Sequence, residues 1–133
     1  MQLQIGVKVL IKNSKGLYLL VQRTDTLSNN QEHAWDIPGG RINPEEDLRS
    51  ALTREVNEEI GIKLTDAPKL IDAQDIFVTT KDLHVVRLTY TIDMDVSDII
   101  LSQEHQAHTW TSLEDAFQLN VDPYLKKILS KLL

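Results

Sequence analysis

Three glutamates in one short stretch, Glu55, Glu58 and Glu59, are the residues whose spacing most clearly suggests chemistry. In a helix they lie three and four residues apart, so they share one arc of its surface at about 100° per residue. Their like charges repel each other, and the nearby cation, Arg54, is spaced to pair with Glu58 on the next turn. Carboxylates, carbonyl oxygens and water are the ligands that Mg²⁺ or Mn²⁺ prefers. The pattern therefore indicates a site for a hard divalent cation.

Two glycines, Gly39 and Gly40, precede this acidic face and follow a short expected strand at residues 35 to 37. Glycine allows a turn that other residues cannot make, and it lets a backbone carbonyl approach a metal or a phosphate without a side chain in the way. The sequence therefore predicts a strand, a tight glycine turn and one helix as the elements that position the carboxylates.

The helix has a clear expected start and end. Asn43 is a suitable N-cap, Pro44 suits the first helical position, and Glu46 completes a variant of the capping box. Gly61 can take the left-handed conformation just past the helix end. An apolar stripe for burial recurs at helical spacing, formed by Leu48, Ala51, Leu52 and Val56.

Residues 40 to 62 resemble the Nudix box, the signature of hydrolases that act on a nucleoside diphosphate linked to another group. The pattern is a glycine, five residues, a glutamate, seven residues, Arg-Glu, an aliphatic residue, any residue, Glu-Glu, any residue, a glycine and an aliphatic residue. This chain matches it without departure, through Gly40, Glu46, Arg54, Glu55, Val56, Glu58, Glu59, Gly61 and Ile62.

The resemblance implies a reaction in which water attacks phosphorus in a diphosphate linkage, with Mg²⁺ or Mn²⁺ as cofactor. A glutamate takes the proton from the water, and which glutamate does so varies across the family. Arg54 is implied to orient a glutamate rather than to touch substrate, whereas Glu46 is expected to act first as a cap. The groups implied around the metals are a glycine carbonyl and the carboxylates, from Gly39, Gly40, Glu55, Glu58 and Glu59.

Three further residues are weaker candidates. Glu104 lies in a segment similar to the loop where many family members place one more metal-binding glutamate; otherwise it is a surface residue. Arg23 ends an expected strand, where a basic residue of the family often faces the substrate phosphates, although a solvated arginine explains it equally well. Trp35 is a candidate for substrate binding, but such a tryptophan is more often part of a core or pocket wall. The polar residues 24 to 32 are expected to form a substrate-contacting loop.

The four histidines show no metal-ligand spacing on a common helix and are expected to be surface or strand residues.

The resemblance also limits the expected substrate class, because marker residues of several Nudix subfamilies are absent. Family members that cleave ADP-ribose, dinucleoside polyphosphates, NADH or coenzyme A tend to carry marker residues, and those markers are absent here. This favours the MutT-like group, which cleaves nucleoside triphosphates, including damaged deoxy forms, to monophosphate and pyrophosphate. An ADP-ribose or nucleotide-sugar pyrophosphatase without the usual marker and a non-catalytic nucleotide sensor remain alternatives, but a sensor would not need every glutamate of the box.

Length and composition limit the domain number, the binding partners and the cellular location that we expect. The length of 133 residues is that of one domain, 1–133. The net charge of −6 argues against a surface that binds the phosphates of a nucleic acid. The chain has no cysteine, which excludes disulfides and thiolate sites. The absence of a basic leader and of a long apolar run predicts a cytoplasmic protein without a membrane partner. We also expect either a monomer or a homodimer.

The order of the expected elements predicts the fold class. Period-two alternation and turn residues predict strands, and Asp122-Pro123 predicts the start of a final helix. Hairpins outnumber crossovers, so we expect an α/β/α sandwich around a mixed β-sheet, which the Nudix resemblance also implies. The strands are expected at residues 4–12, 17–22, 35–37, 70–78, 83–94 and 108–111.

Overall fold

The computed structural model describes residues 1–24 and 34–133. Within these residues, seven strands form one mixed sheet. They are β1 (Gln2–Lys12), β2 (Tyr18–Arg23), β3 (Trp35–Asp36), β4 (Gly39–Arg41), β5 (Lys69–Val78), β6 (Leu83–Asp93) and β7 (His105–Thr111). The helices are α1 (Leu48–Ile60), α2 (Leu113–Ala116), α3 (Pro123–Leu132) and the short 3₁₀ turn η1 (Thr79–Lys81).

Strand β1 is the element to which the rest of the sheet is joined. It pairs in parallel with β6 along its whole length, from Gln2 opposite Leu83 to Lys12 opposite Asp93. Its middle also pairs with β4, and its end forms a hairpin with β2, which in turn pairs with β3 and β7. The parallel pairing places β1, at the start of the chain, beside β6, which comes from the second half of the chain.

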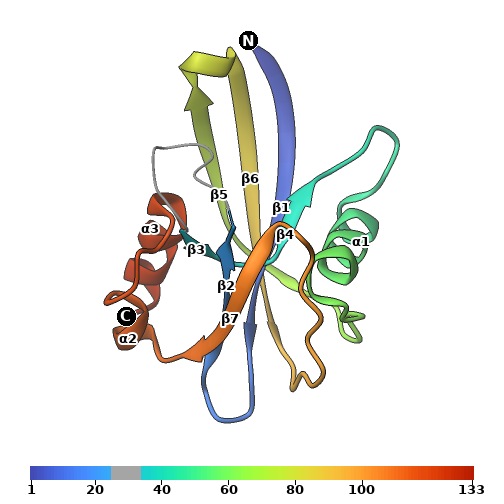
Figure 1. The fold of residues 1–133 in the computed structure, drawn as a ribbon. Helices are drawn as coiled ribbons and strands as arrows, with labels where there is room; N and C mark the ends of the chain where they lie inside the picture. The colour runs from blue at the N-terminus through green and yellow to red at the C-terminus, as the bar shows by residue number, and fades with distance from the viewer. Residues whose placement is uncertain (25–33) are drawn as a thin grey trace.

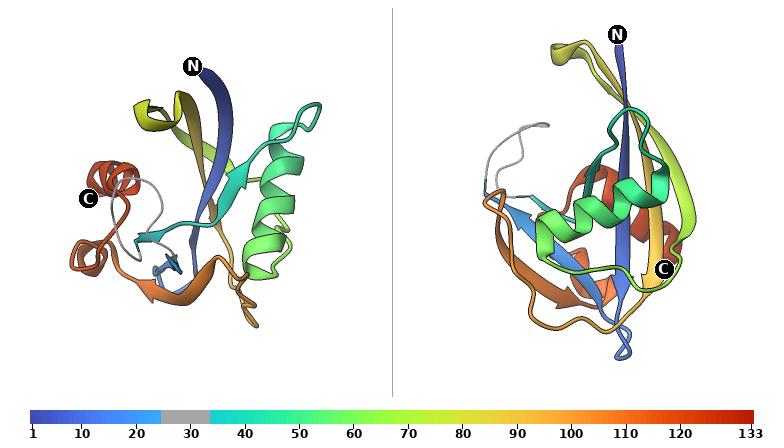
Figure 2. Two further views of the ribbon diagram at one scale, coloured as in Figure 1. Left: turned by 45° about the horizontal axis from the view of Figure 1, so that its top comes forward. Right: turned by 90° about the vertical axis from the view of Figure 1, so that its right-hand side faces the viewer.

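Helices cover both faces of the sheet, with α1 on one side and α2 and α3 on the other (Figures 1 and 2). The expected α/β/α sandwich is therefore confirmed. Two clusters of buried apolar residues form the core, one between the sheet and α1 and the other between the sheet and α3. Val7, Val9 and Ile11 of β1 belong to the α1 side, whereas Leu10 belongs to the α3 side.

The alternation of apolar and polar residues from Gln4 to Lys12 is typical of a strand buried on one face, and this interpretation is wrong for the second half of β1. Val9, Leu10 and Ile11 are all fully buried because helices cover the strand from both sides. Strand β7 is also longer than expected, since it begins at His105 rather than at His108. The final helix is confirmed: the Asp122 side chain caps α3 by accepting hydrogen bonds from the Tyr124 and Leu125 amides at 3.0 and 3.1 Å.

Helix α1 starts later than the sequence predicts. Its N-cap is Asp47, whose carboxylate accepts a hydrogen bond from the Ser50 amide at 2.8 Å. Asn43 instead begins a turn, in which Glu45 has a left-handed φ of 68° that no helix residue can adopt. Glu46 does accept the Asn43 amide at 3.0 Å, so half of the expected capping contact forms outside the helix. The end of the helix at Gly61, with φ 70°, is as expected.

In the described part of the chain, no helix is long and apolar enough to cross a membrane.

Candidate functional site

The expected tight turn at the two glycines is wrong: Gly39 and Gly40 lie in strand β4, which pairs with β1 and packs against α1. Gly39 has φ 144°, and a Cβ atom there would overlap the Val7 carbonyl oxygen and lie 2.7 Å from the Lys8 Cα. A Cβ atom at Gly40 would overlap the carboxylate of Glu55. The two glycines are therefore required for different reasons: Gly39 allows the positive φ and the close pairing of β4 with β1, and Gly40 leaves room for a carboxylate of the acidic helix.

The three glutamates on the arc of α1 have different exposures. The side chain of Glu55 is 14% exposed, that of Glu58 is 57% exposed, and that of Glu59 is 8% exposed. Glu59 therefore points into the protein and Glu58 toward solvent, with Glu55 between them beside Gly40. Among residues 1–24 and 34–133, no three carboxylate or imidazole groups are arranged so that they could already hold a metal ion.

Arg54 makes the expected pair with Glu58 and several shorter contacts as well. Its guanidinium donates to both oxygens of Glu46, at 2.7 and 2.9 Å, and to Glu55 at 2.8 Å. It also donates to the Arg41 carbonyl at 3.0 Å, whereas Glu58 lies farther away at 3.4 Å. These hydrogen bonds lower the pKa of Glu46 to about 2 and raise that of Arg54. Arg54 thus links the turn before the helix to Glu55.

Glu59 lies in the most shielded part of the acidic arc. Burial raises the pKa of its carboxyl group to about 7, against opposing effects of the Lys8 charge and of a hydrogen bond from the Gly39 amide. Its Oε2 atom is buried and has no hydrogen-bond partner among the described residues. The Nε2 atom of His105, whose side chain is 7% exposed, is 3.4 Å from that oxygen. The sequence analysis missed His105, because no sequence spacing relates β7 to α1.

A second cluster of charges surrounds Asp36, which is buried at the end of β3. Arg87 donates to its carboxylate at 2.7 Å, Arg23 donates at 3.3 Å, and the Lys8 ammonium lies 3.6 Å away. Burial alone would raise the pKa of Asp36, but the charges of Arg87, Lys8 and Arg23 hold it well below its usual value. The three cations come from β1, β2 and β6, so only the assembled sheet brings them together.

The same cluster reaches α3 through Asp122. Arg87 donates to the Asp122 carboxylate at 3.2 Å, and this carboxylate also caps the helix. Burial raises the pKa of Asp122, with a further increase from the charge of Asp36 that Arg87 opposes. Arg87 therefore bridges two buried carboxylates. The sequence predicted a role only for Asp122, as a helix cap, and none for Asp36 or Arg87.

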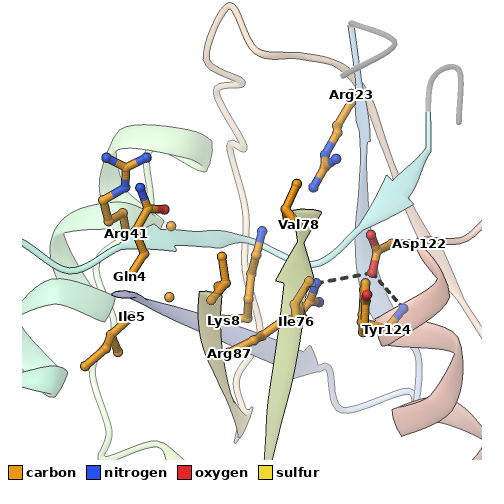
Figure 3. Close-up of a pocket in the computed structure, with 13 residues that line it drawn as sticks. Gln4, Ile5, Lys8, Arg23, Arg41, Ile76, Val78, Arg87, Asp122 and Tyr124 are labelled. Carbon is orange, nitrogen blue, oxygen red and sulfur yellow. Dashed lines mark hydrogen bonds and ion pairs between the residues drawn. The ribbon is translucent and has the colours of Figure 1, made fainter. Parts of the chain in front are cut away.

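A cavity of about 260 Å³ opens next to both groups of charges (Figure 3). Its polar lining includes four cations, Lys8, Arg23, Arg41 and Arg87. In Figure 3, Gln4 and Arg41 lie at one end and Asp122 and Tyr124 at the other, with Lys8 between them. Apolar side chains of β1, β5 and β6 form part of the wall, namely Ile5, Ile76, Val78 and Val85. Gly40 also lines the cavity, and the Glu55 carboxylate of α1 lies against this glycine, although α1 contributes no residue to the described lining.

The other expected site residues are placed differently. Arg23 does line the cavity, in contact with Asp36. Trp35 instead packs at the edge of the apolar cluster under α3 and does not line this cavity. Glu104 is exposed, and its carbonyl accepts the Thr24 amide at 2.9 Å. The expected substrate-contacting loop, 24–32, lies outside the described residues apart from Thr24.

The oxygen-rich donor set fits a hard divalent cation. Glu59 offers a buried oxygen without a hydrogen-bond partner in the described structure, and Glu55 lies against a glycine that leaves space beside its carboxylate. Divalent ions such as Mg²⁺ are bound through one or two carboxylates, carbonyls and water. The chemistry of these side chains is thus compatible with the metal that the fold family implies.

Comparison with known proteins identifies the class. The family model described as NUDIX domain matches residues 2–132, so the chain belongs to the Nudix family and is a MutT-like Nudix hydrolase. Hydrolases of this family generally use a divalent metal.

Individual relatives support the same assignment. The chain is 32% identical to the CTP pyrophosphohydrolase of Escherichia coli over 90% of this chain and 84% of the relative. It is 38% identical to the asymmetrical bis(5'-nucleosyl)-tetraphosphatase of Rattus norvegicus over 82% of this chain and 73% of the relative. Among solved structures, the MutT protein of Methanosarcina mazei superposes with a TM-score of 0.83 at 30% identity, covering 97% of this chain and 91% of that one.

Proposed function

We propose that this protein hydrolyses a nucleoside triphosphate, in ribose, deoxyribose or oxidised form, to the monophosphate and pyrophosphate. The observation that carries the proposal is a cavity lined by four cations and by Gly40, the glycine against which the Glu55 carboxylate of the acidic helix lies. A nucleotide needs both features, because its phosphates are anionic and its base and ribose offer surface for apolar contacts. The names of the relatives from Escherichia coli and Rattus norvegicus support a nucleotide substrate.

The cations offset the repulsion that the acidic protein exerts on a polyanion. Two unit charges 4 Å apart interact by about 1 kcal/mol in water and about 4 kcal/mol at an effective dielectric of 20. Arg41 lies next to Gly40 in β4, where a phosphate chain would approach the helix. Lys8, Arg23 and Arg87 are already engaged with the buried carboxylates, so they shape that part of the cavity and keep its local charge balanced.

The residues proposed to hold Mg²⁺ or Mn²⁺ are Glu55, Glu58 and Glu59, with a carbonyl of Gly39 or Gly40 and with Glu104 as a further candidate. When bound, the cation polarises phosphate oxygens and lowers the pKa of a water ligand. Arg54 keeps the Glu55 carboxylate oriented toward Gly40 through its own bonds to Glu46. One of the glutamates accepts the proton of the attacking water, and Glu59, which titrates near neutral pH, has a pKa suited to that role.

A nucleotide panel tests the proposal. CTP, the other nucleoside triphosphates, 8-oxo-dGTP, ADP-ribose, a nucleotide sugar and a dinucleoside tetraphosphate are incubated with the protein and Mg²⁺, and the products are separated by ion-exchange chromatography. We expect a triphosphate to be converted to monophosphate and pyrophosphate at the highest kcat/KM. Faster turnover of ADP-ribose or of the dinucleoside tetraphosphate would replace this assignment with a pyrophosphatase or an asymmetrical tetraphosphatase. Binding without turnover of any compound would indicate a sensor.

The cytoplasmic location and the monomeric or homodimeric state expected from the sequence remain predictions. Gel filtration with light scattering tests the second of these.

A further inference from the structure

The segment before β7 docks on the C-terminal end of the acidic helix. The Ile100 amide donates to the Ile60 carbonyl at 3.0 Å, and the Ser102 amide donates to the Glu59 carbonyl at 2.9 Å. The last carbonyls of a helix have no partner within the helix, so these bonds satisfy groups that would otherwise need water. Ile99 and Leu101 also pack against the apolar cluster under α1. The segment is thereby held in register with Glu59.

This docking directs His105 toward the helix and leaves Glu104 outside. The His105 amide donates to the Ser102 carbonyl at 3.2 Å, which closes a turn, and its imidazole is almost completely buried. The Nδ1 atom lies 3.4 Å from the Ser102 hydroxyl, and the Nε2 atom lies 3.4 Å from Oε2 of Glu59. The imidazole of His105 is therefore the side chain that this segment places against Glu59.

The Glu59 carboxylate has a specific need for a donor at this point. On the side of β4, the Gly39 amide lowers the pKa of the Glu59 carboxyl group, against the effect of burial. The Oε2 atom is buried without a hydrogen-bond partner in the described structure, which is costly for a carboxylate. A small shift of the imidazole toward Glu59 would form a hydrogen bond from Nε2–H to Oε2, because their separation of 3.4 Å is only slightly longer than a hydrogen bond.

We propose that His105 is a positioning residue for Glu59, whose carboxylate it holds toward Gly39 of β4 through a hydrogen bond from Nε2–H to Oε2. In this arrangement the Ser102 hydroxyl donates to Nδ1 and keeps the ring proton on Nε2. The inference rests on the proposed function, because it takes Glu59 as a group that binds the metal or accepts the proton. Metal sites commonly depend on such supporting hydrogen bonds.

The test compares two substitutions of His105 that differ in hydrogen bonding. His105→Phe keeps a planar ring but removes the donor, whereas His105→Gln retains an amide donor near the position of Nε2. His108→Phe, at an exposed position of the same strand, is the control. For each protein we would measure Mn²⁺ affinity by titration calorimetry without nucleotide, CTP turnover with Mg²⁺, and melting temperature in EDTA.

The expected result separates positioning from packing. His105→Phe should weaken Mn²⁺ binding and lower kcat by about 10- to 100-fold while the KM for CTP changes less than about twofold. His105→Gln should recover most of both losses, and His108→Phe should resemble the parent protein. If His105→Phe binds Mn²⁺ and turns over CTP like the parent, the inference is wrong.

Two other outcomes also decide the matter. Equal losses in His105→Phe and His105→Gln, with a lower melting temperature in both, would show a packing role and overturn the inference. A parent protein that neither binds Mn²⁺ nor hydrolyses any nucleotide of the panel would overturn the proposed function itself, and the positioning role with it.

Discussion

Arg54 and Glu46 form a two-bonded ion pair across the start of α1, with Nε to Oε2 at 2.7 Å and Nη2 to Oε1 at 2.9 Å. On an ideal helix, Glu46 would lie almost opposite the acidic arc. It reaches Arg54 because the chain is not yet helical at Glu46 and turns back at Glu45. The same guanidinium contacts Glu55, so Glu46 acts on the acidic arc through Arg54.

The first prediction tests this link. Glu46→Gln removes the charge that fixes Arg54, so the orientation of Glu55 should become less defined and turnover should fall roughly tenfold, as for other residues that support metal ligands. Steady-state hydrolysis of CTP at saturating Mg²⁺ measures the effect. Glu45→Gln, an exposed change in the same turn, is the matched control and should leave kcat unchanged. Full activity of Glu46→Gln would show that Arg54 orients Glu55 without its partner.

The second prediction concerns metal dependence. Since the acidic arc would repel a nucleotide without a cation, hydrolysis of every compound in the panel should stop in excess EDTA and return with added Mg²⁺ or Mn²⁺. Product formation is followed by chromatography before and after the additions. Turnover that continues in EDTA would contradict the proposed role of the glutamates.

The third prediction separates chemistry from folding. Glu58→Gln preserves shape and helix propensity, so its melting temperature should stay close to that of the parent. Its turnover should fall at least about 10²-fold, which corresponds to about 2.7 kcal/mol in the barrier. Leu52→Gln should instead lower the free energy of unfolding by more than about 1 kcal/mol, because it places a polar group at a fully buried core position. Undiminished turnover in Glu58→Gln would mean that the chemistry rests on the other glutamates.

The fourth prediction follows from the raised pKa of Glu59. Burial raises this pKa to about 7 from its ordinary value of 4.5, so the folded protein retains a proton that the unfolded chain releases. The free energy of unfolding of the metal-free protein should therefore fall as pH rises through this interval, by at most about 3 kcal/mol from this group. Urea unfolding in EDTA at several pH values measures it. Glu59→Gln should remove this contribution; identical pH profiles for parent and variant would refute it.

The fifth prediction tests the buried charge cluster. Arg87→Met removes the cation that bridges Asp36 and Asp122, so two buried carboxylates lose a partner. The expected loss of stability is about 3–5 kcal/mol. Arg49→Met, at an exposed position of α1, should change the free energy of unfolding by less than about 0.5 kcal/mol. A stability change in Arg87→Met as small as that of the control would show that the cluster contributes little to folding.

Features that depend on neighbours along the chain were predictable from the sequence. The acidic arc of Glu55, Glu58 and Glu59 follows from helical spacing, the helix end follows from Gly61, and the cap of α3 follows from Asp122. Helix and strand periodicity also sufficed for the fold class. The N-cap of α1 was misplaced from Asp47 to Asn43, because both residues are good caps and local sequence does not rank them.

Contacts between distant residues were decided only by the tertiary structure. Asp36 and Arg87 are 51 positions apart, and Arg87 and Asp122 are 35 apart. Alternation on a strand assigns a side chain to a face but does not say which strand lies beside it. The parallel register of β1 with β6 and the docking of the segment before β7 on α1 set those neighbours. The approach of His105 to Glu59 and the cation-lined cavity therefore exist only because packing of the whole chain fixes which strands and loops are adjacent.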